Sequence, residues 1–269
     1  MEIAIVTGAS SGLGEKYAKL LDGEGLDELW LIARRRPQLE ALAEKLQTPC
    51  RILPLDLTAN ASFTALQDTL TKQGKGLTVR YLLHAAGFGK MGPVTSIPPG
   101  ILENMVDLND RSAITLTQFL LPYCVPGSHL AFIASCAAFL PIPELAVYAA
   151  SKAFLLRYCR ALAAELAPQG ILVSAVCPYW VKDTEFIKTA STTDQKHQFR
   201  HYLLAGTKES IARRSFKGIK KGRTVITPRC RLDAAALCLC LDSPGYLIVL
   251  QPNFSLNPWA GLLFSYIIL

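Results

Sequence analysis

Short apolar runs alternate with longer segments of helical period from the first residue to about Thr184. The runs are apolar on both faces, which is typical of strands in a parallel sheet that helices cover on both sides. The alternation therefore predicts an α/β fold, a Rossmann-type doubly wound parallel sheet in three α/β/α layers. The expected strands are 2–6, 28–33, 51–55, 81–85, 129–134 and 172–176, and the expected helices are 12–21, 37–46, 62–72, 100–109, 112–123 and 148–167.

The composition excludes several other classes of protein. The chain has 269 residues, 51% apolar and 18% charged, so it can fill a large core, unlike a disordered or collagen-like chain. Its eight cysteines show no C-x-x-C and no paired Cys/His spacing. We therefore expect no metal site, and mostly buried, reduced thiols in a cytoplasmic protein. Residues 1–6 lack the features of a signal peptide, and no run reaches the roughly 18 apolar residues of a spanning helix.

The basic charge is concentrated in one segment. Residues 196–231 hold eleven Lys and Arg against one Glu, while the whole chain has a net charge of +7. The segment has neither interleaved aromatic residues nor a nucleic-acid-binding motif, so we expect no nucleic-acid partner and interpret it as a solvated segment beside an anionic ligand. Lys217, Lys220 and Lys221 could hold an anionic acyl thioester.

A glycine-rich turn follows the first expected strand and opens the first expected helix. It reads Thr7-Gly8-Ala9-Ser10-Ser11-Gly12-Leu13-Gly14. Glycines at such a turn let the backbone approach a pyrophosphate, and the helix N-terminus supplies free N–H groups. Tight turns and helix caps also use glycine, so the motif gains its meaning from its place at the first strand-to-helix junction. The turn predicts a dinucleotide-binding site.

The end of the second strand distinguishes the two common dinucleotides. It reads Ala33-Arg34-Arg35-Arg36, without the carboxylate that would hold the ribose hydroxyls of NAD. A guanidinium group can pair with a 2′-phosphate, so we expect NADP(H) to be preferred over NAD(H), with Arg34 as first candidate and Arg35 as second. Asp56, followed by Leu57, could lie near the adenine amino group or cap the next turn.

Tyr148 and Lys152 are four residues apart at the start of a helix and so share one face. An ammonium group near a phenol favours the phenolate and lowers its pKa. Ser135 lies just past an expected strand, where its hydroxyl could bond a carbonyl oxygen. Chance alone often produces Y-x-x-x-K, but open parallel sheets bind ligands at the carboxyl ends of their strands, where all three residues are expected.

These motifs together resemble the short-chain dehydrogenase/reductase family. Within it, Gly87-Phe88-Gly89 followed by Gly92-Pro93 is most similar to bacterial oxidoreductases of broad or unassigned carbonyl specificity. The resemblance extends over residues 1 to about 186. The residues that carry it, in family order and spacing, are Thr7 to Gly14, Asp56, Ala85-Ala86-Gly87, Asn109, Ser135, Tyr148, Lys152 and Pro178.

The resemblance implies an oxidoreductase that reduces a ketone or aldehyde with NADPH by hydride transfer. Tyr148 would be the general acid or base, Lys152 would lower its pKa and hold the nicotinamide ribose, Ser135 would orient the carbonyl, and Asn109 would position a water that links Lys152 to solvent. The implied cofactor-binding residues are Gly8, Ser10, Ser11, Gly12, Leu13, Gly14, Arg34, Arg35, Asp56, Leu57, Ala85, Ala86, Gly87, Tyr148, Lys152, Pro178, Val181 and Thr184.

The chain departs from the family pattern at three places. His84 stands where the family usually has an asparagine, and we interpret it as a structural replacement. The segment after Pro178 is one residue longer before Thr184, so the register of the nicotinamide contacts is open. The third departure is the C-terminal part, where we expect one or two polar helices over 185–223, broken near Gly206 and Gly218, and a seventh strand over 246–250.

We expect one domain, 1–269, in which 1–184 carries the functional residues and 185–269 lies on the substrate side. A homo-oligomer, a dimer or tetramer, is expected from the family resemblance. The last residues, 259–269, are apolar except Ser265 and could pack on their own domain, cover an oligomer face or lie on a lipid surface, and we favour the first.

The substrate pocket is expected to be apolar, which favours an acyl, alicyclic or steroid-like carbonyl over a sugar. Two other functions compete, an NAD-linked alcohol dehydrogenase that works oxidatively and a non-catalytic cofactor-sensing protein on the same fold. The expected pocket walls are Phe88, Met91, Phe139, Leu140, Ile142, Tyr179, Trp180 and Phe186.

Overall fold

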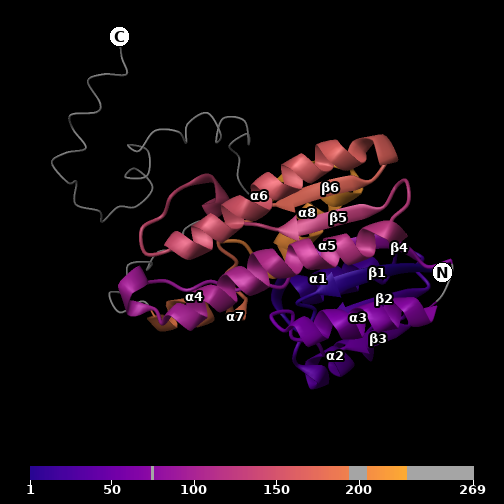
Figure 1. Ribbon diagram of the computed structural model, residues 1–269, viewed down its shortest axis with the longest axis horizontal. Coiled ribbons are helices and arrows are strands. Elements are labelled where there is room, and N and C mark those ends of the chain that lie inside the picture. The colour runs from indigo at the N-terminus through magenta and orange to yellow at the C-terminus, as the bar shows by residue number, and fades with distance from the viewer. Residues whose placement is uncertain (74–75, 194–204, 229–269) are drawn as a thin grey trace, which may run out of the picture.

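The computed structural model describes residues 1–73, 76–193 and 205–228, and its elements alternate along the chain as Figure 1 shows. The strands are β1 (Glu2–Thr7), β2 (Glu28–Ile32), β3 (Cys50–Leu53), β4 (Thr78–His84), β5 (His129–Ile133), β6 (Leu172–Val176) and β7 (Val225–Ile226). The α-helices are α1 (Gly12–Leu21), α2 (Arg36–Ala43), α3 (Asn60–Gln73), α4 (Pro99–Val106), α5 (Ser112–Leu120), α6 (Ala146–Leu166), α7 (Glu185–Ala190) and α8 (Lys208–Lys220).

All seven strands are parallel and lie in the order β3-β2-β1-β4-β5-β6-β7. The strand order reverses between β1 and β4, so a crevice forms there at the carboxyl ends of the strands. A π-helical segment, Asp107–Arg111, joins α4 to α5, and a short 3-10 helix, Cys136–Phe139, follows β5.

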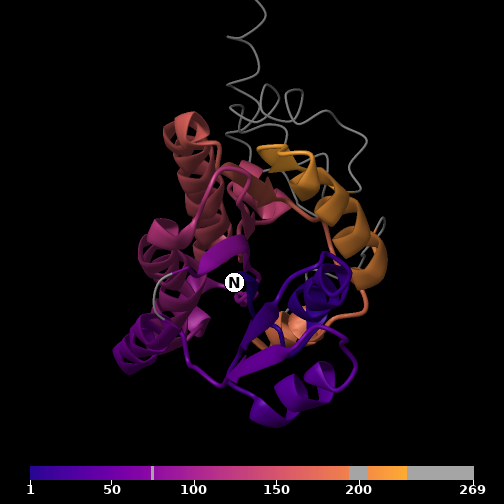
Figure 2. The ribbon, with the colours of Figure 1, turned by 90° about the vertical axis from the view of Figure 1, so that its right-hand side faces the viewer.

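Helices cover both faces of the sheet and make three layers (Figure 2). The apolar side chains of α3, α5 and α6 pack on one face, and those of α1, α2 and α8 pack on the other. Strand β2 serves both layers, because Trp30 and Ile32 point to the first and Leu29 and Leu31 to the second. The doubly wound, single-domain α/β fold predicted from the alternation is confirmed.

The last described elements complete the sheet rather than forming a separate unit. Helix α8 packs against α1, where Tyr17 Oη and Ser215 Oγ share a buried 2.6 Å hydrogen bond. The predicted break at Gly218 is wrong, because α8 continues through it. A Cβ on Gly218 would lie 2.9 Å from Ile226 Cδ1, so the glycine permits close packing of α8 on β7. The break near Gly206 is confirmed, since that residue precedes α8.

The seventh described strand is β7, a segment to which the sequence analysis assigned no element. The strand predicted over 246–250 and the apolar residues 259–269 lie outside the described residues. Among the described residues, no helix combines the length and apolar character needed to cross a membrane. The described cysteines are free thiols; Cys159 and Cys177 are buried, but Cys50, Cys124 and Cys136 are half-buried, so the expectation of mostly buried thiols was too strong.

Candidate active site

The glycine turn lies at the carboxyl end of β1, directly beside the chain that leaves β4. A Cβ on Gly8 would lie 2.8 Å from the Ala85 carbonyl oxygen, and a Cβ on Gly14 would lie 2.3 Å from the carbonyl oxygen of Gly8. Gly12 differs, since it has φ +59° and a Cβ there would meet only Thr184 Cγ2, at an ordinary contact distance of 3.7 Å. Two glycines therefore permit close backbone packing within the turn, and the third permits the left-handed conformation at the start of α1.

The first turn of α1 has unused hydrogen-bonding capacity. Ser11 is the N-cap residue in extended conformation, and its side chain caps no backbone N–H of the helix. The backbone N–H groups of the first helical residues, including Leu13, are free to meet an anion, and the helix dipole adds a partial positive charge. This arrangement fits a pyrophosphate group.

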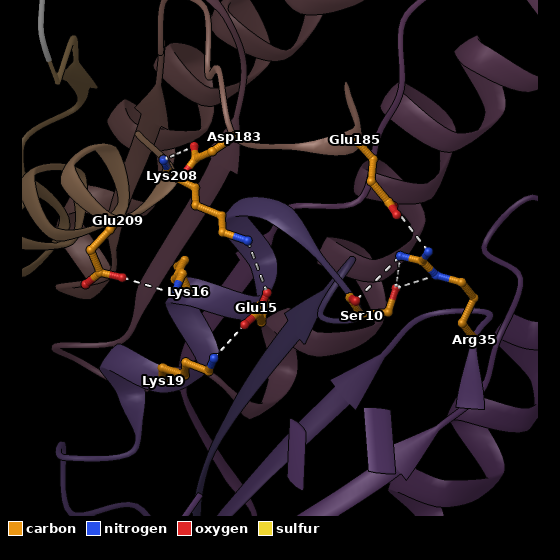
Figure 3. Close-up of polar contacts among 9 residues, drawn as sticks. All are labelled: Ser10, Glu15, Lys16, Lys19, Arg35, Asp183, Glu185, Lys208 and Glu209. Carbon is orange, nitrogen blue, oxygen red and sulfur yellow. Dashed lines mark hydrogen bonds and ion pairs between the residues drawn. The ribbon is translucent and has the colours of Figure 1, made fainter. Parts of the chain in front are cut away.

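Arg35 lies against the same turn, as Figure 3 shows. Its Nε and Nη2 atoms donate to Ser10 Oγ at 3.3 and 3.2 Å, and Nη1 forms a 3.2 Å ion pair with Glu185 at the start of α7. Arg34, the first candidate for the 2′-phosphate, is exposed and lies instead near Asp56. The structure thus brings the second candidate, rather than the first, onto the glycine turn.

Asp56 caps the turn that follows β3. Its Oδ1 atom accepts hydrogen bonds from the Thr58 backbone N–H and hydroxyl at 3.0 and 2.9 Å. Burial alone would raise the pKa of Asp56, but these bonds and the charge of Arg34 hold it below its ordinary value. Leu57 is buried in the hydrophobic core, so only its backbone is available to a cofactor.

The chain after β4 lies between the glycine turn and the predicted catalytic residues. The Ala86 backbone N–H donates to Thr7 Oγ1 at 3.0 Å, which ties the ends of β4 and β1 together. A Cβ on Gly87 would lie 2.8 Å from Asn109 Oδ1 and 3.3 Å from Lys152 Nζ. A glycine is therefore required where this loop passes the two side chains.

Ser135, Tyr148 and Lys152 come together at the carboxyl end of β5. Ser135 caps the 3-10 helix and forms a hydrogen bond with Tyr148, and Lys152 Nζ lies 5.7 Å from the Tyr148 ring centroid. Lys152 Nζ donates to the Ile133 carbonyl oxygen at 2.9 Å. The grouping predicted from the sequence is present in the structure.

Burial dominates the protonation of this group. It raises the pKa of Tyr148 to about 12, against a smaller lowering by the Ser135 hydrogen bond, and it lowers the pKa of Lys152 to about 8. The expected lowering of the Tyr148 pKa by Lys152 is therefore not what this structure shows. At neutral pH Tyr148 holds its proton and Lys152 is mostly charged.

Asn109 makes three hydrogen bonds to its protein neighbours. Its Oδ1 accepts from the Phe88 backbone N–H, and its Nδ2 donates to the Phe88 carbonyl oxygen and to Ser151 Oγ, each at 3.0 Å. Ser151 Oγ in turn donates to the Tyr148 carbonyl oxygen at 2.9 Å. The side chain of Asn109 thus ties the loop after β4 to α6.

His84 lies in the core and away from the reacting group. Its Nε2 is 3.1 Å from Thr117 Oγ1, and its ring stacks on Phe132 with a centroid distance of 4.6 Å. Burial lowers its pKa to about 3, so it is neutral at physiological pH. These contacts agree with a structural rather than a catalytic place.

The segment after β6 passes over the whole crevice. Pro178 is buried and its carbonyl oxygen accepts from the Cys136 N–H at 3.0 Å, while Val181 forms an isolated bridge with Gly206. Thr184 then lies over Gly12, and the ring of Phe186 lies 5.4 Å from that of Tyr148.

The expected pocket walls only partly gather around Tyr148. Met91 is buried in one apolar cluster with it, and Phe88, Ile142, Trp180 and Phe186 pack against that cluster. Phe139 instead packs on the main core, and Tyr179 is exposed at 43%.

Three basic residues of the described part of the basic segment, Lys208, Arg213 and Lys220, form ion pairs with acids. Lys208 contacts Glu15 at 3.7 Å, and Lys16 contacts Glu209 at 3.1 Å, so α8 is bound to α1 by charge (Figure 3). Lys220, in the last turn of α8, pairs with Glu24 at 2.8 Å, beyond the C-terminal end of α1. That end of α1 is opposite the glycine turn, so Lys220, with Lys217 and Lys221 near it at the end of α8, lies away from the crevice, and this position does not support the thioester role considered for them.

Sequence analysis missed three residues at this site. Ser151 connects Asn109 to Tyr148, Glu185 pairs with Arg35, and Asp110 is buried next to Asn109 with Oδ1 lacking a hydrogen-bond partner. The sequence offered one indication of Asp110, because it is an acidic residue that directly follows Asn109, between the two expected helices 100–109 and 112–123. Within the described ranges, no three His, Cys, Asp or Glu side chains are grouped so as to hold a metal ion.

Comparisons with known proteins show which family the chain is similar to. The model of the short chain dehydrogenase family matches residues 2–195. An uncharacterised oxidoreductase of Staphylococcus epidermidis is 29% identical over 179 residues, 66% of this chain and 76% of that protein. A very-long-chain 3-oxoacyl-CoA reductase of Kluyveromyces lactis is 32% identical over 193 residues, 66% of this chain but only 54% of the reductase.

The fold also resembles solved structures along most of its length. A short-chain dehydrogenase from Sphingobium yanoikuyae in complex with NADPH superposes with a TM-score of 0.75 at 24% identity, covering 96% of this chain and 98% of that one. The family match over most of the chain and the shared fold lead to one conclusion: the chain belongs to the short-chain dehydrogenase family of NAD(P)-dependent oxidoreductases.

Proposed function

We propose that the protein uses NADPH to reduce an apolar ketone or aldehyde to an alcohol, with Tyr148 as the general acid. The observation that supports this best is the buried group at the end of β5, in which Tyr148 bonds to Ser135 and lies beside Lys152. A protonated phenol and a second hydroxyl at one place can both bond a carbonyl oxygen.

The residues around the crevice fit a dinucleotide. The glycine turn and the free N–H groups of α1 would hold the pyrophosphate, and the loop at Gly87 would face the nicotinamide half. Lys152 would bond the nicotinamide ribose, and Pro178, Val181 and Thr184 lie on the segment that would cover it. The adenosine half would meet Asp56, the Leu57 backbone and the arginines after β2.

The preference for NADPH is supported by two guanidinium groups at that end. Arg35 touches the glycine turn through Ser10, and Arg34 lies near Asp56, so both can reach a phosphate on the adenosine ribose. The similar enzyme from Sphingobium yanoikuyae was solved with NADPH. Replacing Arg34 or Arg35 by Asp should each reduce affinity for NADPH much more than for NADH. The variant with the larger effect identifies the arginine that binds the phosphate. An unchanged ratio of NADPH affinity to NADH affinity in both variants would refute the assignment of the 2′-phosphate to these arginines.

The protein's part in the reaction is orientation and a proton. When bound, the cofactor supplies the hydride that the carbonyl carbon receives. Ser135 Oγ donates a hydrogen bond that orients the carbonyl, and the Tyr148 Oη–H bond breaks as its proton passes to the carbonyl oxygen. Because the Tyr148 pKa is about 12, the group carries that proton at neutral pH, which suits reduction. The Lys152 ammonium group stabilises the phenolate that remains.

An apolar substrate is supported by the surroundings of Tyr148. The Phe186 ring and the cluster that includes Met91 form an apolar surface beside Tyr148. The relative from Kluyveromyces lactis is named for reduction of a very-long-chain 3-oxoacyl-CoA, so long-chain 3-oxoacyl thioesters belong in the substrate panel. Turnover of polyols or sugars alone would refute an apolar pocket.

The test is oxidation of NADPH and NADH against ketones, aldehydes and 3-oxoacyl thioesters. Tyr148→Phe should reduce kcat at least a hundredfold, since general acid catalysis contributes roughly that much. Tyr158→Phe is the matched control, because Tyr158 is half-buried on the same helix about 15 Å further along. Equal activity of Tyr148→Phe and the parent would refute the proposal.

The same assay separates the two competing functions. Faster alcohol oxidation with NAD than reduction with NADPH would favour an oxidative dehydrogenase. Tight NADPH binding without turnover of any panel member would favour a cofactor-sensing protein. We further propose a cytoplasmic homo-oligomer without a nucleic-acid partner, which gel filtration and fractionation of the cell would test.

A further inference from the structure

Asp110 is a buried carboxyl group with no use in the mechanism above. It is only 7% exposed, and its Oδ1 atom is buried without a hydrogen-bond partner. It follows Asn109 in the π-helical segment, which buries both of these side chains. Asp107 and Arg111 of the same segment remain partly exposed and pair with each other at 2.7 Å. Burying a carboxylate without a partner is costly, so Asp110 needs a physical explanation.

The charged group whose field acts on Asp110 is Lys152, on helix α6, and the π-helical segment packs against this helix. The two do not form a direct ion pair, yet their charges act on each other through the protein interior. Lys152 is itself only 5% exposed, and its Nζ atom donates to a backbone carbonyl. The other titratable groups facing Lys152 are the thiol of Cys177, beyond the end of β6, and Tyr148 on its own helix.

Burial and charge oppose each other on this pair. Burial lowers the pKa of Lys152 to about 8, close to working pH, and the negative charge of Asp110 acts to raise it. Burial raises the pKa of Asp110 to about 7, and Lys152 acts to lower it. Small changes in pH therefore change how much of each group is charged.

We propose that Asp110 is a positioning residue that keeps Lys152 in its ammonium form, so that the phenolate left on Tyr148 is stabilised during turnover. This inference rests on the proposed reduction. Asp110 acts through Lys152 and touches no reacting atom. Without its carboxylate, burial alone would decide the charge of Lys152, and the ammonium form would be lost at a lower pH.

The first test is the pH dependence of kcat for Asp110→Asn. The alkaline limb should move to lower pH by roughly one unit, the low end of the shift expected when a nearby opposite charge is lost. Well below pH 7 the parent's Asp110 is itself protonated, so the variant and parent should converge there. Asp107→Asn is the matched control, because it removes a charge from the same segment without facing Lys152, and its limb should stay in place.

Asp110→Leu removes the same charge without introducing amide donors, so it should show the same shifted limb if the Asn variant folds poorly. If Asp110→Asn or Asp110→Leu folds and its alkaline limb lies at the same pH as that of the parent, the proposal is overturned. Identical shifts in Asp107→Asn would do so as well, because the effect would not then depend on Lys152.

A second measurement needs no turnover. The folded-state pKa of Asp110 lies above its unfolded value, so its contribution to stability is present at low pH and is lost as pH rises through about 7. The urea midpoint of Asp110→Asn relative to the parent should therefore rise between pH 5 and pH 8. If the parent turns over no carbonyl but this rise is seen, the proposed reduction fails while the buried Asp110 charge stands. If the parent turns over and the rise is absent, the assignment of Asp110 fails by itself.

Discussion

Gly14→Ala should displace the backbone of the cofactor turn. A Cβ at this position would lie 2.3 Å from the Gly8 carbonyl oxygen and 3.1 Å from the Ala9 backbone nitrogen. Carbon and oxygen atoms need more than 3 Å, so the backbone of the turn must move by about 1 Å, and no flexible side chain can absorb the movement. Adding a methylene to a packed core costs about 1–3 kcal/mol, and we expect the upper end here because both obstructing atoms are backbone.

Gly23→Ala is the matched control, because it follows the same helix and its Cβ would meet nothing within 4 Å. It should leave stability unchanged or raise it by up to about 1 kcal/mol through a less flexible unfolded chain. Urea unfolding, monitored by circular dichroism, gives the free energy of unfolding of each variant. Titration of the folded proteins with NADPH gives the affinity for the cofactor. The displaced turn should lower NADPH affinity at least tenfold, or about 1.4 kcal/mol. If Gly14→Ala has the same free energy of unfolding and the same NADPH affinity as Gly23→Ala, the packing argument is refuted.

Two further predictions follow from the site. Because the His84 pKa is about 3 when folded and about 6.5 in an unfolded chain, the stability that neutral His84 contributes is present above pH 6.5 and is lost as pH falls, by up to about 1.4 kcal/mol per unit. In urea unfolding at pH 6.5 and 5, His84→Asn should lose less stability than the parent, and equal losses would contradict this. Replacing Lys217, Lys220 and Lys221 by Gln should leave KM unchanged for both a 3-oxoacyl thioester and a small ketone, since these side chains lie away from the crevice. A higher KM for the thioester alone would show that they reach it.

The first six strands and their helices could be predicted because each pattern is local. Strands such as β4 (Thr78–His84) are apolar along most of their length, and turn residues separate them from the helices. β7 (Val225–Ile226) could not be found this way, since two residues show no period and the strand exists only by pairing with β6. Gly218 was misjudged for a similar reason. Its role depends on Ile226, which is adjacent only in the folded chain.

At the site, the sequence predicted which residues gather but not what they contact. The glycine turn, Ser135, Tyr148 and Lys152 follow from motif and spacing. The choice between Arg34 and Arg35 depends on which side chain points toward Ser10, and neighbouring positions near a strand end give no such information. The raised pKa of Tyr148 likewise depends on the depth of burial, because the desolvation of its phenolate outweighs the hydrogen bond from Ser135.

The extra residue before Thr184 has a physical consequence for the whole crevice. The Lys182 N–H donates to the Gly206 carbonyl oxygen at 3.0 Å, and Asp183 Oδ1 accepts from the Lys208 N–H at 2.6 Å, so the segment is fixed from the side of α8. Just beyond these bonds, Thr184 lies over Gly12, and the next two residues contact Arg35 and Tyr148. A shift of one residue would therefore move the contacts to the pyrophosphate turn, the adenosine end and the reacting phenol together. The bonds to residues 206 and 208 hold this register, together with the hydrogen bond that Thr184 Oγ1 donates to the Val181 carbonyl oxygen at 3.1 Å.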